Sequence, residues 1–377
     1  MEISQATTLL FTLEFPPYKG GIAKYYENLA NYWPTGDLFV LADNIWGGTD
    51  SEKIKFRPLR NKYLRPRWLP ALWYLSQELK YARAGQVIVG QILPLGKAAY
   101  FLSKFIKFKY SVVLHGLDFS LAVKTKAKRK ITGKILSRAD KIICANNYTA
   151  NLVKSFALNL SDKITVVNPG IEPSFVRNPQ RVRELKEKNN LNDKIILFGL
   201  GHLVARKGFD QVIKAVAAIN SSLPRISYAI GGSGPEKENL IKLTDSLSPE
   251  IKNKIIFLGQ LSDADRWAWL ELCDIFIMTS RNLNGDFEGF GTVYLEANLA
   301  GKPIIAGDSG GVRDAVINNI NGILVDSENL PEISQAIIKL AADPALRQAL
   351  GEQGKRRTVE NFNAKKQVEK LYHQLIS

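Results

Sequence analysis

The chain has 377 residues, 45% of them hydrophobic and 23% charged, and this balance excludes a disordered, collagen-like or low-complexity protein. At roughly 150 residues per domain, the length predicts two domains of ordinary size. The formal net charge is +15, and residues 1–175 carry 25 basic against 12 acidic side chains, so most of the net positive charge lies in the first half.

The cysteines and the apolar stretches indicate in which cellular compartment the chain is expected to lie. Cys144 and Cys273 both lie in apolar runs and are too few for a disulfide framework, which favours a reduced, cytoplasmic chain. The N-terminus lacks a basic segment leading into an apolar one, so we expect no signal peptide. The most apolar stretch of the first half, residues 86–102, is interrupted by Pro94 and Lys97, so we expect no membrane span there.

Short apolar runs rich in β-branched residues alternate with longer helical patterns along the chain. In the first half they predict strands at 8–13, 38–41, 87–89, 112–114, 141–144 and 164–167, with helices that include 21–32 and 67–82. In the second half they predict strands at 195–199, 226–230, 255–258, 275–278, 303–305 and 322–325, with helices that include 263–272 and 292–300. Strands that are apolar on both faces are typical of parallel sheets covered by helices, so we predict an α/β protein.

The domain boundaries follow from composition. Residues 1–172 are expected to form an N-terminal Rossmann-like domain, and residues 190–355 a C-terminal one. The segment 170–192, with two prolines and a charged run, is interpreted as the linker. A last helical pattern within 356–377 follows all the strands and is expected to cross back to the N-terminal domain.

Three basic clusters with aromatic neighbours account for much of the charge of the first half: 57–67, 104–110 and 124–130. Such clusters suit an anionic membrane surface, where each cation near the surface contributes about 1 kcal/mol. Nucleic acid would attract the same charge. No zinc-finger spacing and no aromatic RNP run accompanies it, so we expect an acidic lipid or another anionic acceptor as partner rather than nucleic acid.

The strongest motif is EGFGTVYLE at 288–296, which follows the strand predicted at 275–278. Its glycines let the backbone approach a ligand closely. A helix beginning near Thr292 directs the amides of Phe290, Gly291, Thr292 and Val293 outward at its positive end, which is a favourable site for a diphosphate. Gly289 belongs to the same donor-binding turn. Glu288 lies before that helix and Glu296 lies more than a turn inside it, so the two carboxylates can meet different parts of one ligand.

Four weaker motifs also follow predicted strands. They are the basic pair Arg206-Lys207 within 201–208, the GGSGP turn that contains Gly232, the diglycine Gly20-Gly21, and the HGLD sequence from His115 to Asp118. Ligands of open parallel sheets bind beyond the carboxyl ends of the strands, so all four are placed for function.

Together with the sequence GDSGG at 307–311, these motifs resemble those of the retaining family 4 glycosyltransferases of the GT-B fold. Within that family, EGFGTVYLEA and AGDSGGVRDAV are most similar to the bacterial phosphatidylinositol-mannoside-type mannosyltransferases. The resemblance covers almost the full chain. It implies two Rossmann-like domains whose sheets face a central cleft, with the donor held mainly by the second domain and the acceptor mainly by the first.

The resemblance also implies residue roles. Glu296 would bind the ribose hydroxyls, Glu288 the donor-sugar hydroxyls, and the amides of residues 290–293 the diphosphate. Lys207 matches a phosphate-binding lysine, His115 a histidine near the transferred sugar, and Gly21 a loop that meets the phosphate. Contacts with the base are expected around Leu261.

One departure concerns position 202, where the family usually has arginine and this chain has His202. A neutral imidazole cannot replace a bidentate cation. Either Arg206 takes over that role, or His202 is protonated beside the diphosphate, or donor binding is weakened.

The implied activity is hexosyl transfer, with mannose favoured, from a nucleotide diphosphate sugar to a lipid-linked or polysaccharide acceptor in cell-envelope glycan synthesis. The implied mechanism is a front-face reaction that retains the anomeric configuration, in which the leaving diphosphate takes the acceptor's proton. No Asp-x-Asp pair stands at a strand end, so we expect no cofactor and no obligatory metal. The enzyme is expected to be cytoplasmic and peripheral at the inner face of the cell membrane.

Several alternatives stay open from the sequence. The donor could be a UDP-sugar instead of GDP-mannose, and the fold could serve a nucleotide-sugar epimerase or hydrolase. A dinucleotide-dependent oxidoreductase is disfavoured, because no complete G-x-G-x-x-G follows the first strand of either half. A basic membrane- or nucleic-acid-binding protein without catalysis is the remaining alternative.

Overall fold

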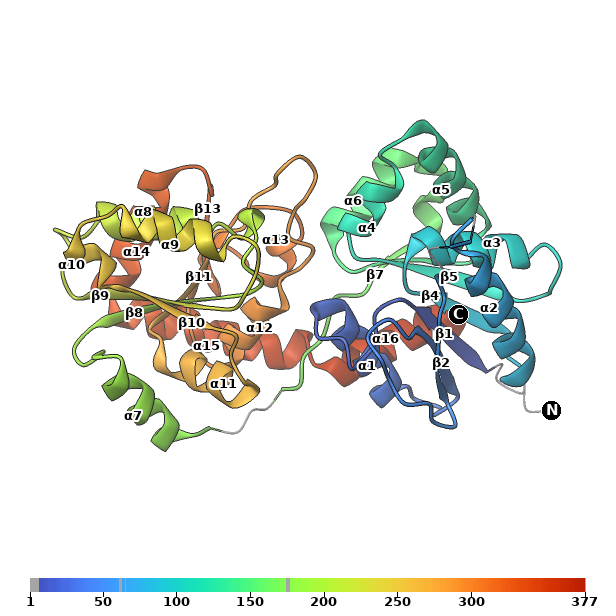
Figure 1. Cartoon of the computed structure of the whole chain (residues 1–377), viewed down its shortest axis with the longest axis horizontal. Helices are drawn as coiled ribbons and strands as arrows, with labels where there is room; N and C mark the ends of the chain where they lie inside the picture. Colours follow the sequence, from blue (N-terminus) through green and yellow to red (C-terminus); the bar gives the residue numbers. More distant parts are fainter. Residues whose placement is uncertain (1–6, 61–62, 65, 174–176, 377) are drawn as a thin grey trace. The chain divides into compact units, whose positions relative to one another are not determined.

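The computed structural model describes residues 7–60, 63–64, 66–173 and 177–376 (Figure 1). The chain divides into two compact units, one made of the residues up to Gly170 together with those from Ala364 on, and one made of Ile171–Asn363. Within the described residues, no helix is long and apolar enough to cross a membrane. The first six residues, on which the expectation about a signal peptide depends, lie outside this part, as do Lys62 and Arg65 of the first basic cluster.

The first unit is built on a seven-stranded sheet with the order β3-β2-β1-β4-β5-β6-β7, in which every pairing is parallel. Its strands are β1 (Thr8–Thr12), β2 (Leu38–Asp43), β3 (Ile54–Arg57), β4 (Gln86–Val89), β5 (Lys109–Leu114), β6 (Ile142–Cys144) and β7 (Ile164–Val166). The six strands predicted in this half are present.

Helices cover both faces of this sheet. They are α1 (Gly21–Tyr32), α2 (Leu69–Tyr81), α3 (Lys97–Leu102), α4 (Leu117–Ala122), α5 (Lys126–Arg138), α6 (Asn147–Phe156) and α16 (Ala364–Ile376), with short helical turns η1 (Ile92–Gly96) and η2 (Leu158–Lys163). Successive strand residues point to opposite faces, so Leu9 and Phe11 pack with α2 and its neighbours whereas Leu10 packs with α1 and α16. This two-sided burial explains why β1 is apolar throughout.

The second unit repeats this architecture around a six-stranded parallel sheet with the order β10-β9-β8-β11-β12-β13. Its strands are β8 (Ile195–Leu200), β9 (Ile226–Gly231), β10 (Ile255–Gly259), β11 (Ile275–Met278), β12 (Ile304–Gly307) and β13 (Gly322–Val325). All six were predicted.

Two hydrophobic cores lie on the two sides of this second sheet. One contains side chains of α7, α11 and α12, and the other side chains of α8, α9 and α14. The helices of the unit are α7 (Pro179–Lys188), α8 (Phe209–Ala218), α9 (Lys237–Asp245), α10 (Pro249–Lys252), α11 (Asp263–Leu272), α12 (Thr292–Leu299), α13 (Val312–Ala315), α14 (Leu330–Ala342) and α15 (Pro344–Asn361), with the turn η3 (Ala205–Lys207).

The structure differs from the predicted elements at three places. The edge strand β3 was not predicted. The segment 170–192 is not simply a linker, because it contains α7, whose Arg181 Nε lies 2.7 Å from Asp265 Oδ1 on α11. The last helical pattern is two helices, α15 and α16, which are separated at Phe362 and Asn363, and α16 belongs to the first unit, as expected for a segment that crosses back.

Both cysteines are buried free thiols, as predicted.

Candidate functional site

In the second unit, four predicted motifs follow the carboxyl ends of β8, β9, β11 and β12. Loops at these strand ends lie along one edge of a parallel sheet. The main chain links them in two pairs: the N–H of Leu203 donates to the carbonyl of Ser233 at 2.9 Å, and the N–H of Gly311 donates to the carbonyl of Glu288 at 2.9 Å. An ion pair between Lys207 and Glu288 joins the two pairs, so the motifs form one connected group of loops.

The glycine-lined turn before α12 leaves peptide nitrogens available. Gly291 is the N-cap residue, with a φ of 79°, and the helix has no side-chain cap. The N–H of Tyr294 donates to the carbonyl of Gly291 at 2.9 Å, whereas the N–H groups of Thr292 and Val293 have no acceptor within the described part of the chain. Two unpaired N–H groups at the positive end of a helix attract an anion.

Gly291 and Gly310 are positions where only glycine fits. At Gly291 an added Cβ would lie 2.5 Å from the ring of Tyr294, and at Gly310, where φ is 60°, it would lie 2.4 Å from the carbonyl oxygen of Glu288. The GDSGG segment therefore packs against the main chain of the turn. The side chain of Phe290 is buried and contacts Phe362, with ring centroids 5.7 Å apart. These contacts hold the turn before α12 in place.

Glu288, Lys207 and Arg206 form a charged network. The Glu288 Oε2 atom lies 2.5 Å from Lys207 Nζ and 2.8 Å from an Arg206 guanidinium nitrogen. Burial alone would raise the pKa of Glu288, but the charges of Lys207 and Arg206 outweigh it and lower that pKa to about 2. The carboxylate is therefore ionised at neutral pH and keeps both cations beside it.

The loop that carries these cations is fixed by close backbone packing. Gly208 has a φ of 71°, and an added Cβ there would lie 2.0 Å from the carbonyl oxygen of Thr279. Gly232 has a φ of 130°, and a Cβ there would meet the carbonyl oxygen of Gly201. The glycines of both motifs thus serve loop-to-loop packing at these positions.

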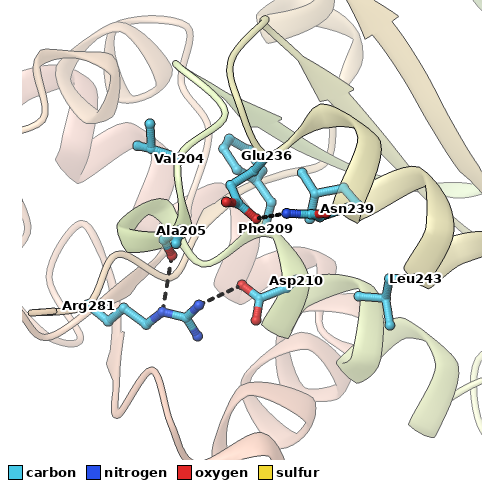
Figure 2. A pocket seen from close by; sticks show the side chains of 9 residues that line it. Val204, Ala205, Phe209, Asp210, Glu236, Asn239, Leu243 and Arg281 are labelled. Atoms are coloured by element: carbon cyan, nitrogen blue, oxygen red, sulfur yellow. Dashed lines mark hydrogen bonds and ion pairs between the residues drawn. The ribbon is translucent and has the colours of Figure 1, made fainter.

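A cavity of about 120 Å³ lies beside this loop, and none of the residues that line it was predicted as a site residue (Figure 2). Its lining residue Arg281 donates through Nε to the carbonyl of Ala205 at 3.1 Å and pairs with Asp210 at 3.1 Å. The N–H of Arg281 also donates to the carbonyl of Arg206 at 2.8 Å. Arg281 therefore holds the main chain of η3, the turn that presents Arg206 and Lys207.

Glu296, predicted to bind ribose, is held by an arginine that the sequence analysis did not single out. Its Oε1 atom accepts a hydrogen bond from Arg266 on α11 at 2.9 Å. The Glu296 side chain keeps 16% of its surface exposed and that of Arg266 keeps 29%. Arg266 thus orients the carboxylate, which keeps a small exposed surface.

The other candidates of this unit lie around the network. His202 is exposed and follows β8, and the structure shows no ion pair for it within the described residues. Leu261 packs on the end of β9, where a Cβ on Gly231 would lie 2.9 Å from it. Of the predicted donor-site side chains, the structure therefore brings together Glu288, Lys207 and Arg206.

In the first unit, His115 and Asp118 lie where β5 ends. The Oδ1 atom of Asp118 accepts hydrogen bonds from the main-chain N–H groups of His115 and Gly116, both at 2.9 Å. Burial raises the pKa of Asp118 to about 6, although these backbone hydrogen bonds oppose the change. Burial also lowers the pKa of His115 to about 4, so its ring is neutral at pH 7.

The helix α1 contributes one predicted and one unpredicted feature to this site. The predicted diglycine, Gly20 and Gly21, begins the helix, and Gly20 has an extended backbone as its N-cap. The hydroxyl of Tyr26, which was not predicted, lies 2.9 Å from His115 Nε2. Across the residues described, no cluster of three or more His, Cys, Asp or Glu side chains could hold a metal ion.

Comparisons with known proteins identify the family. A profile described as Glycosyltransferase Family 4 matches residues 19–175, and one described as Glycosyl transferases group 1 matches residues 181–357. The GDP-mannose-dependent alpha-(1-6)-phosphatidylinositol monomannoside mannosyltransferase of Mycolicibacterium smegmatis is 27% identical over 367 residues, which cover 94% of each chain. The enzyme of the same name from Mycobacterium tuberculosis is 29% identical over 361 residues, 92% of each chain.

Solved structures agree on the fold. HepE from Anabaena, in complex with UDP, superposes with a TM-score of 0.80 at 16% identity, and the match covers 98% of this chain and 99% of that one. The two wound parallel sheets and this structural similarity together give the GT-B fold. The chain is a glycosyltransferase and belongs to glycosyltransferase family 4.

Proposed function

We propose that this glycosyltransferase moves a hexose, with mannose favoured, from GDP-mannose to a lipid-linked or polysaccharide acceptor in cell-envelope glycan synthesis, with retention of the anomeric configuration. The names of the similar mycobacterial enzymes support both the donor and the lipid acceptor. A partial relative from Rhizobium meliloti, 30% identical over 185 residues, is named a lipopolysaccharide core biosynthesis glycosyltransferase. Cell-envelope glycans are therefore the acceptor class to test first.

The observation that carries the proposal is the turn before α12. The free N–H groups of Thr292 and Val293 and the ammonium of Lys207 belong to the same group of loops. A diphosphate needs donors of this kind, fixed in advance, where its negative charge lies. Glu296, oriented by Arg266, supplies the carboxylate for a ribose diol.

In the proposed mechanism the protein contributes mainly electrostatics. Charge grows on the departing diphosphate in the transition state, and the helix N-terminus with Lys207 stabilises it. The diphosphate oxygen then takes the acceptor's proton on the same face of the sugar. Glu288 keeps Lys207 and Arg206 in place and offers its carboxylate to sugar hydroxyls.

We propose that no metal ion is needed, because Lys207, Arg206 and the unpaired N–H groups of Thr292 and Val293 belong to the loops proposed to hold the diphosphate. The test is turnover after treatment with EDTA. Full activity is expected, and activity that returns only on adding Mg²⁺ or Mn²⁺ would contradict this part.

The donor is tested by thermal shift and product formation with GDP-mannose and with UDP-sugars. We expect the larger stabilisation from GDP and GDP-mannose, and a product with the donor's anomeric configuration by NMR. A UDP-sugar is the second candidate, because HepE was solved with UDP. Nucleotide-sugar turnover without any acceptor would instead favour the epimerase or hydrolase alternative.

We also propose that the enzyme is cytoplasmic and that its first unit binds an anionic membrane. Phe105 is 85% exposed and lies between Lys104 and Lys107, and Tyr63, in another basic cluster, is 83% exposed. An exposed aromatic ring among lysines matches the chemistry of an acidic lipid surface.

A further inference from the structure

Tyr26 connects two strand ends of the first unit through its hydroxyl group. The side chain is fully buried on α1. Its hydroxyl lies 2.6 Å from the carbonyl oxygen of Gly90, directly after β4, and 2.9 Å from Nε2 of His115, directly after β5. His115 matches the family's histidine near the transferred sugar, so the position of its ring proton bears on how that sugar is bound.

Counting protons determines that pattern. A tyrosine hydroxyl has one proton to donate, and a carbonyl oxygen can only accept. The Tyr26 proton therefore goes to Gly90, and the contact with His115 is a hydrogen bond only if Nε2 is the donor. The ring of His115 must then carry its proton on Nε2.

The second ring nitrogen is consequently an acceptor. The neighbours of the ring are aromatic: Tyr25 and Tyr26 meet it edge-on, at centroid distances of 5.2 and 5.5 Å. The nearby carboxylate of Asp118 is bonded to main-chain N–H groups, not to the ring. With the pKa lowered to about 4 by burial, no second proton is bound at pH 7, so Nδ1 carries a lone pair.

Nδ1 is also available to a ligand. Within the described part of the chain, no side chain or main-chain group forms a hydrogen bond with it. His115 keeps part of its surface exposed, and its unpaired Nδ1 atom is not sealed from solvent. The open position of the ring is therefore an acceptor, which suits a hydroxyl group.

We propose that Tyr26 is a positioning residue that holds His115 in the Nε2–H tautomer, so that Nδ1 accepts a hydrogen bond from a hydroxyl of the bound sugar. This inference rests on the proposed function for its sugar ligand. In this arrangement His115 contributes recognition as a neutral acceptor, and it neither donates nor removes a proton in the transfer step.

The test is ¹⁵N NMR of the histidine rings in the whole enzyme at pH 7.5. The chain has only three histidines, His115, His202 and His373, so substituting one at a time assigns each ring. We expect His115 to show a protonated Nε2 and an unprotonated Nδ1. In Tyr26→Phe the buried Nε2–H would have no acceptor, so the proton should move to Nδ1, which can reach water.

Tyr25→Phe is the matched control. Tyr25 is also buried against the His115 ring, but its hydroxyl has no hydrogen-bond partner in the described chain. Removing that hydroxyl should leave the tautomer and the activity unchanged. Tyr26→Phe should lower kcat/KM for sugar transfer about tenfold, because a protonated Nδ1 can no longer accept the hydrogen bond from the sugar hydroxyl, while the affinity for free GDP, which has no sugar, stays the same.

The outcomes separate this inference from the proposed function. An Nδ1–H tautomer in the wild type, or an unchanged tautomer in Tyr26→Phe, overturns the inference even if the enzyme transfers mannose efficiently. The expected tautomers in a protein that turns over no nucleotide sugar would overturn the proposed function and the sugar contact, while the role of Tyr26 in fixing the ring would stand.

Discussion

Replacing Glu288 by glutamine tests the charged network beside α12. The structure lowers the pKa of this carboxyl from 4.5 to about 2, and its side chain is only 9% exposed. A pKa difference of this size corresponds to about 3 kcal/mol of folding free energy at pH 7. Glutamine keeps the shape but removes the charge that pairs with Lys207 and Arg206, so we expect a loss of that order.

The pH dependence has a definite sign. Because the pKa is lower in the folded than in the unfolded chain, the ionised carboxylate stabilises the fold fully above pH 4.5. That stabilisation disappears as the pH falls from 4.5 toward 2. The difference between wild type and Glu288→Gln should therefore be largest at neutral pH and should shrink steadily below pH 4.5.

Urea unfolding of both proteins at pH 7, 4 and 3 measures this difference. Glu352→Gln, at an exposed position on α15 of the same unit, is the control and should cost little at any pH. A loss below about 1 kcal/mol at pH 7, or one that does not change with pH, would refute the network as described.

Two further predictions concern the ligands. Glu296→Ala should weaken nucleotide-sugar binding about tenfold by calorimetry with the fold intact, because a carboxylate with one oxygen on Arg266 is lost from the ribose site; unchanged affinity would remove Glu296 from the site. Binding to anionic liposomes should fall as salt rises, and Phe105→Ser should weaken it, because the exposed ring and its lysine neighbours act together. Equal pelleting with neutral and anionic vesicles would exclude the membrane proposal.

The strands were predictable because their burial is visible in residue type. β1, β8 and β11 are covered on both faces, so their sequences are apolar without alternation. The edge strand β3 has the sequence IKFR and only one buried side chain, Phe56, so it lacks that signal. Its pairing with β2 is a tertiary contact that local sequence does not encode.

The helix α7 was missed for a related reason. It is highly charged, and the structure buries only Leu185 fully within it. What holds it is the distant partner α11, through Arg181 and Asp265. Pro179 at its first turn and Asn178 as its N-cap are standard start signals that could have identified it.

The candidate site was also predictable only where its signals are local. Glycine spacing and charge at strand ends predicted the turn before α12 and the pair Arg206-Lys207. Arg266, Arg281 and Tyr26 act on site residues that are far from them in sequence. In the sequence, Tyr26 is an ordinary residue of the apolar face of its helix. A buried tyrosine hydroxyl normally requires a hydrogen-bond partner, but the sequence does not show which group that partner is.

The position of the donor diphosphate is tested most directly by amide NMR of enzyme labelled with ¹⁵N at threonine and valine. The N–H groups of Thr292 and Val293 are predicted to receive the diphosphate, so adding GDP should shift both signals strongly, whereas guanosine, which lacks the phosphates, should not. If GDP binds at a measured affinity and neither signal moves, the diphosphate lies elsewhere and the proposed donor site is wrong.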